Sequence, residues 1–61
     1  MNNEDIRNLI QSHIPDIKVR CVYRICETED GRLVFGVNGN NNKICAIAIV
    51  NILTGAVEIR K

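Results

Sequence analysis

The most apolar stretch of the chain runs from Lys43 to Ile52, and both of its alternating sets of side chains are almost wholly apolar. A strand directs successive side chains to opposite faces of a sheet, so both faces of this segment need cover. The pattern therefore predicts a central strand rather than a solvated edge. A buried helix is the alternative interpretation, but the enrichment in isoleucine and valine favours a strand.

The N-terminal segment predicts a short amphipathic helix over residues 3–14. Its apolar side chains form one helical stripe: Ile6, Leu9, Ile10 and Ile14. Asn2 or Asn3 can cap its first turn, and Pro15 ends it because proline disfavours helical geometry at the preceding residue. About three turns of helix are too short to persist alone, so this helix must dock on the rest of the chain.

Three further strands are predicted where the apolar period changes to two, over residues 17–26, 32–38 and 56–60. Glycine-containing turn clusters at 29–31, 38–42 and 54–55 separate the strands. The sequence thus predicts a single α+β domain over residues 1–61. Its N-terminal helix packs on a four-stranded antiparallel meander sheet, in the order αββββ.

The parity of side chains predicts the register of this sheet. A two-residue turn at Asp30-Gly31 would place the apolar sets of the first two strands on opposite faces, whereas a three-residue loop at 29–31 pairs Ile25 with Phe35. The same parity along the meander predicts these further pairs: Tyr23–Val37, Val37–Ile44, Phe35–Ala46, Leu33–Ala48, Ile52–Val57 and Val50–Ile59. All core side chains then lie on the face that the helix covers.

The other face of the sheet, here called the open face, is left without cover because one short helix covers only one face. The predicted register places there the apolar side chains of Val22, Cys26, Val34, Cys45, Ile47 and Ile49. Glu58 is the only acid on this face. Basic side chains surround the apolar ones: Lys18, Arg20, Arg24, Arg32 and Arg60. An apolar patch with a polar rim is typical of a protein interface.

The partner-binding residues predicted from this pattern are Val22, Val34, Ile47, Ile49, Lys18, Arg20, Arg24 and Arg32. Three interpretations of the open face stay open: a solvated surface with scattered apolar residues, a self-associating surface, and a surface for an acidic protein partner.

Length and charge narrow the classes of function. A chain of 61 residues buries only about 60% of the surface that its unfolded form exposes, so a small domain needs additional stabilisation. Three cysteines without a CxxC spacing argue against disulfides and a metal, which leaves a homodimer or higher homo-oligomer.

A net charge of +1 gives no general attraction to nucleic acid or to a membrane. No segment has the length of a membrane span, and the acidic N-terminus does not resemble a signal peptide, so we expect a cytoplasmic protein.

Candidate chemistry is sparse. His13 falls at the end of the predicted helix, where its charge suits the helix dipole. Cys21 is predicted to point inward and Cys26 outward, so the two cannot form a disulfide. A nucleophile built from Cys21 and His13 would have no orienting acid. The 38–42 loop lacks the lysine and the helix of a phosphate-binding loop. The sequence therefore predicts no catalytic residue, no metal and no cofactor.

A nucleic-acid-associated protein is the alternative function. Lys18, Arg20 and Arg24 form a short basic row that could contact phosphates. The only aromatic residues, Tyr23 and Phe35, are predicted to point to the core. Without an exposed aromatic platform, single-strand recognition is weak.

The last part of the chain resembles the end of a PepSY domain, in which a strand leads through a turn and Thr-Gly into a short final strand. Residues 50–57, VNILTGAV, carry the resemblance, with Asn51 where an aspartate is usual. The preceding helix, Pro15 and Asp30-Gly31 also match this pattern. The resemblance implies a small non-catalytic domain that binds or restrains another protein, proposed for peptidases in that family. A cystatin-like or unrelated αββββ module would give the same pattern.

These observations together predict a small non-enzymatic protein-interaction module, an inhibitor or regulator, which binds a protein partner and self-associates through its open face.

Overall fold

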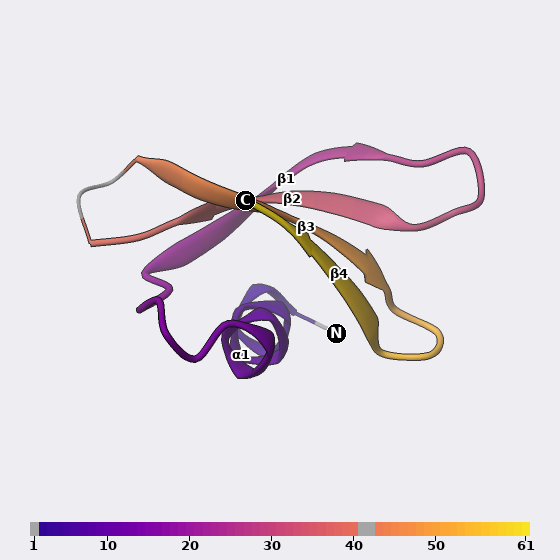
Figure 1. The fold of residues 1–61 in the computed structure, drawn as a ribbon. Coiled ribbons are helices and arrows are strands. Elements are labelled where there is room, and N and C mark those ends of the chain that lie inside the picture. Colours follow the sequence, from indigo (N-terminus) through magenta and orange to yellow (C-terminus); the bar gives the residue numbers. More distant parts are fainter. Residues whose placement is uncertain (1, 41–42) are drawn as a thin grey trace.

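The computed structural model describes residues 2–40 and 43–61, and within them it confirms the predicted αββββ order. The strands form one antiparallel sheet in the order β1-β2-β3-β4, and α1 lies across one face of that sheet (Figure 1). Residues 41 and 42 of the predicted 38–42 loop lie outside the described residues. The elements are α1 (Asn3–His13), β1 (Cys21–Glu27), β2 (Leu33–Asn38), β3 (Ile44–Asn51) and β4 (Ala56–Arg60).

The helix begins as its sequence predicts. The side-chain oxygen of Asn2 accepts a hydrogen bond of 2.9 Å from the backbone N–H of Asp5, which satisfies one of the free donors of the first turn. The helix ends at His13, one residue before the predicted end, because the residue before Pro15 leaves helical geometry. Ile14 is nevertheless buried, so the apolar stripe continues past the helix.

The core lies between α1 and the sheet. Phe35, Ile10, Val37 and Val50 are its largest fully buried side chains. Large and small side chains alternate across the middle strands, since Phe35 pairs with Ala48 and Val37 pairs with Ala46. The alanines of β3 thus leave room for the larger side chains of β2 on the helix side of the sheet.

The loop between β1 and β2 has the predicted length. The backbone N–H of Thr28 donates to the carbonyl of Arg32 over 2.7 Å, which encloses the three residues 29–31. Gly31 closes this loop with φ of 88°, a conformation that suits glycine.

The predicted pairing of β1 with β2 is nevertheless wrong beyond this loop. A β-bulge between Arg24 and Cys26 leaves Ile25 without a partner, and Arg24 pairs with Phe35 in its place. One extra residue reverses the alternation of every side chain that precedes it in the strand. Val22 therefore enters the core with 7% exposure, whereas Tyr23, predicted to point inward, is 39% exposed.

The pairing of β2 with β3, and of β3 with β4, is shifted by two residues from the prediction. Val37 pairs with Ala46, Leu33 with Val50, and Val50 with Val57. A shift by two keeps these side chains on their predicted faces, although the predicted partners are wrong. A second bulge lies between Val37 and Asn38, beyond which Asn38 pairs with Ile44. Ile44, predicted to lie in the core, is therefore 54% exposed. The predicted partner of Val57, Ile52, lies in the turn instead and is 46% exposed.

Side-chain capping within this turn explains why β3 ends early. The side-chain oxygen of Asn51 accepts hydrogen bonds from the backbone N–H groups of Leu53 at 3.0 Å and Thr54 at 3.3 Å. Such a local hydrogen bond offers the backbone an alternative to the sheet ladder.

The first strand begins at Cys21 rather than at Ile17 because the helix binds the preceding segment. The amide nitrogen of Gln11 donates to the carbonyls of Ile14 at 3.1 Å and Ile17 at 2.7 Å. The amide oxygen of the same side chain accepts from the backbone N–H of Val19 at 2.8 Å. This half-buried side chain therefore satisfies one carbonyl at the helix end and two backbone groups that a sheet would otherwise satisfy.

We expect Gln11→Ala to lower the free energy of unfolding by about 1–3 kcal/mol, because it leaves partly buried backbone groups without partners. Urea denaturation followed by circular dichroism measures this loss. Ser12→Ala is the matched control, since Ser12 is exposed and bonds only within the helix region, to Leu9 and His13. Its effect should stay within about 0.5 kcal/mol. Equal losses in the two variants would contradict the bridging role of Gln11.

Candidate functional site: the open face of the sheet

The observed register defines which side chains occupy the open face. Paired residues point to the same side of a sheet, and successive residues alternate between sides. The residues that lie opposite the helix face by this rule are Cys21, Tyr23, Cys26, Arg32, Val34, Gly36, Asn38, Ile44, Ile47, Ile49, Asn51, Ala56, Glu58 and Arg60.

The apolar centre of this face is the part that the sequence predicts correctly. Val34 pairs with Ile49, and Ile47 lies one step further along β3, beside Gly36. All three apolar side chains are half-buried in the isolated chain. They form a continuous patch over β2 and β3.

The predicted rim is only partly correct. Val22 does not belong to the open face, because the β-bulge turns it into the core. Arg24 pairs with Phe35, so it leaves the sheet on the helix side, where its guanidinium lies 3.3 Å from the carboxylate of Glu27. Lys18 and Arg20 are exposed and precede β1. Arg32 alone among the four predicted basic residues lies at the border of the apolar patch.

Tyr23 takes the place on the open face that the sequence predicts for Val22. Its ring lies over Gly36, so closely that a Cβ atom at position 36 would lie 2.6 Å from the ring carbon Cζ. A glycine in the middle of a strand often marks such a close approach. Gly36 was thus the available signal, but it does not reveal which neighbouring side chain covers it.

We expect Gly36→Ala to displace the Tyr23 ring into solvent, because the added methyl group occupies the position of the ring. Tyr23 is the only tyrosine and the chain has no tryptophan, so quenching of tyrosine fluorescence by acrylamide reports this ring alone. Quenching should increase, with a loss of about 1 kcal/mol in unfolding free energy. Ala46→Gly, within the core of β3, is a control that should leave the quenching of the folded chain unchanged. Unchanged quenching in Gly36→Ala would contradict the packing of Tyr23 on Gly36.

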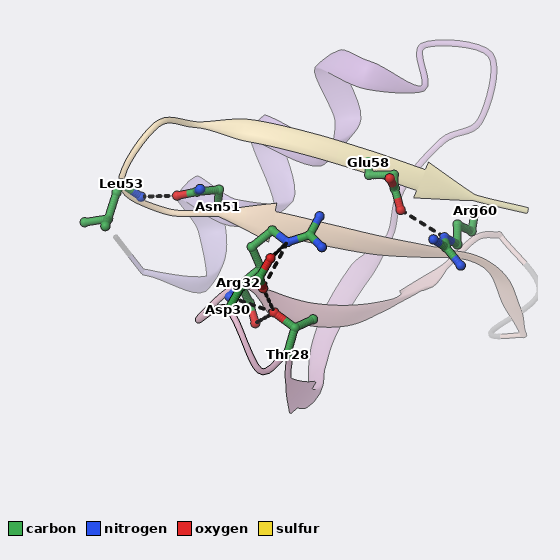
Figure 2. A network of polar contacts seen from close by, with 7 residues as sticks. All are labelled: Thr28, Asp30, Arg32, Asn51, Leu53, Glu58 and Arg60. Carbon is green, nitrogen blue, oxygen red and sulfur yellow. Dashed lines mark hydrogen bonds and ion pairs between the residues drawn. The ribbon is translucent and has the colours of Figure 1, made fainter.

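Polar and charged side chains extend along the open face from the β3–β4 turn to the end of β4, as Figure 2 shows. The Nε atom of Arg32 lies 3.0 and 3.2 Å from the two carboxylate oxygens of Asp30, and the hydroxyl of Thr28 also donates to Asp30. On β4, the Nε atom of Arg60 donates to Glu58 over 2.9 Å. An open cavity of about 440 Å³ lies among these groups, lined by Asp30, Arg32, Ile49, Asn51, Ala56, Val57 and Glu58.

The hydrogen bond from Thr28, and next the one from Arg32, lower the pKa of Asp30 below its ordinary value. Both contacts stabilise the ionised carboxylate. Because the pKa is lower in the folded chain than in the unfolded one, the contribution to stability is present above the ordinary aspartate pKa. It is lost as the pH falls through the lower, folded pKa.

We expect Thr28→Val to raise the pKa of Asp30 towards its ordinary value, because it removes the hydroxyl donor. A pH titration of the side-chain carboxyl carbon by ¹³C NMR measures the pKa directly. Thr54→Val removes a hydroxyl from the other turn and should leave the Asp30 pKa unchanged. A Thr28→Val titration that coincides with the wild-type titration would assign the lowered pKa to Arg32 alone.

The thiols and the histidine do not form a site. Cys21 lies on the open face and is exposed, contrary to the predicted inward position, because the same β-bulge reverses its direction. His13 belongs to α1, on the opposite side of the sheet, with its Nδ1 atom 3.0 Å from the carbonyl oxygen of Leu9. The Cys21–His13 pair considered from the sequence is therefore not formed.

Residues 2–40 and 43–61 contain no group of three or more histidine, cysteine, aspartate or glutamate side chains that could hold a metal ion. Within the same residues, no helix combines the length and the apolar character that crossing a membrane requires.

Comparison of the chain with protein-family models, with curated proteins and with solved structures finds no match. The resemblance to PepSY domains therefore stays a prediction.

Proposed function

We propose that this chain is a small non-enzymatic protein-interaction module whose open face binds another protein surface, and in the first place a second copy of itself. The observation that carries the proposal is the half-buried patch of Val34, Ile47 and Ile49 opposite α1. Tyr23 extends this patch to β1. Tyrosine is enriched in interfaces because its ring combines a large apolar area with a polar end.

The geometry of the face suits a protein surface. Stacked sheets pack about 10 Å apart, with side chains from the two inner faces interdigitating. The isoleucines of β3 project from the middle of the sheet, whereas the space over Gly36 is taken by the Tyr23 ring. A second apolar surface placed here would exclude water from side chains that are only half-buried in the isolated chain.

The charges of the face favour a partner of balanced charge over the acidic target considered from the sequence. Arg32 and Arg60 each have an acid beside them, Asp30 and Glu58 respectively. The basic row of Lys18, Arg20 and Arg24 would contact the phosphates of a nucleic acid. Glu27 forms an ion pair with Arg24 and so reduces the positive charge of that row. We therefore prefer a protein partner to a nucleic acid.

We expect Ile47→Lys to abolish self-association and to leave a folded monomer, because a charge in the centre of the patch cannot be buried without a partner. Light scattering across a hundredfold concentration range measures the mass, and circular dichroism measures the fold. Leu53→Lys is the matched control, since Leu53 is 92% exposed in the β3–β4 turn, away from the patch.

The control should keep the wild-type mass. An Ile47→Lys variant that associates like the wild type would contradict the assignment of the open face. A wild-type chain that is monomeric at every concentration would remove self-association from the proposal.

A further inference from the structure

The charged side chains on the open face alternate in sign along one line. In the view of Figure 2 they follow one another as Asp30, Arg32, Glu58 and Arg60, from the β1–β2 loop to the end of β4. An ion pair of 3.0 Å joins Arg32 to Asp30, and an ion pair of 2.9 Å joins Arg60 to Glu58. Asp30, Arg32 and Glu58 line the same cavity, which places the two ion pairs near each other across β3.

Both arginines retain donors for a further partner. The hydrogen bonds to Asp30 and Glu58 use only the Nε atoms. Figure 2 shows the two terminal nitrogens of Arg32 directed away from Asp30 and over β3. A guanidinium has five N–H donors, and its free edge can bind a second carboxylate through two parallel hydrogen bonds.

An even, alternating series of charges is complementary to its own reversed copy. A two-fold axis that crosses the line between Arg32 and Glu58 brings Asp30 of one copy opposite Arg60 of the other. The same axis brings Arg32 of each copy opposite Glu58 of the other. All four contacts then join opposite charges, whereas the same line in the unreversed direction would join like charges.

We propose that the open face is a two-fold symmetric dimer interface, in which the charge line of one copy pairs with the reversed charge line of the second. This inference rests on the proposed function and specifies its partner and geometry. The axis passes over β3, close to Ile49, which lines the cavity and pairs with Glu58. The apolar patch is then buried beside the charge line, and the charges determine the orientation of the two copies.

Charge-swapped chains test this geometry. In the Arg32→Glu homodimer, the new glutamate of each copy lies opposite Glu58 of the other, so two pairs of negative charges face each other. In the Glu58→Arg homodimer, the new arginine of each copy lies opposite Arg32 of the other, so two pairs of positive charges face each other. Each variant alone should dimerise at least about tenfold more weakly than the wild type, since opposed like charges destabilise an interface. An equimolar mixture of the two should form a heterodimer, because every contact between these two chains again joins opposite charges.

Analytical ultracentrifugation of the two variants, alone and mixed, measures the three dissociation constants. We expect the mixture to recover to within about threefold of the wild type. Arg24→Glu is the matched control: it reverses a charge on the helix side of the sheet and should leave dimerisation unchanged. Circular dichroism checks that each chain is folded.

If a charge reversal prevents folding, Arg32→Gln and Glu58→Gln replace it. The wild-type dimer should weaken with salt, and these neutral variants should lose most of that dependence. Failure of the mixture to recover, or an unchanged salt dependence in the neutral variants, would overturn the paired charge line. The open-face proposal would survive that result if Ile47→Lys still dissociated the dimer. A monomeric wild type would overturn both the symmetric dimer and self-association.

Discussion

The docking of α1 on one face of the sheet is the contact on which the rest of the structure depends. Three turns of helix do not persist alone in water, and four short strands cannot bury an apolar face by themselves. Each element is therefore stable only in contact with the other. The buried side chains of Ile6 and Ile10 supply the apolar part of this contact, and Gln11 supplies the polar part by binding the backbone between the helix and β1. One helix covers one face, and the second face stays accessible.

A single extra residue in β1 decides what that second face contains. Without the bulge at Ile25, Val22 would extend the apolar patch and the Tyr23 ring would enter the core. With the bulge, the smaller valine is buried and the Tyr23 ring extends from the edge strand β1 over Gly36 of β2. The face thus gains an aromatic side chain with a hydroxyl, which suits the interface proposed for it.

The charged groups of the same face serve two structural purposes at once. Asp30 and Glu58 orient the guanidiniums of the half-buried Arg32 and the exposed Arg60, which would otherwise sample many rotamers. Exposed ion pairs of this kind add little to folding stability. In the proposed dimer their role is recognition, because oriented charges select a partner with the complementary arrangement and disfavour the others.

The sequence by itself determined the order of the elements, the three-residue β1–β2 loop, the bounds of β4, and the faces of β2, β4 and residues 46–51 of β3. Hydrophobic periodicity and turn residues are local signals, and a shift of two residues does not change a face. The tertiary structure alone decided the two bulges, the partners across the sheet, and the segment that Gln11 holds outside β1. It also brought Asp30 to the face on which the sequence already placed Arg32, Glu58 and Arg60. These features depend on which of several nearly equivalent pairings best fills the space under α1, and that competition involves residues far apart in the chain.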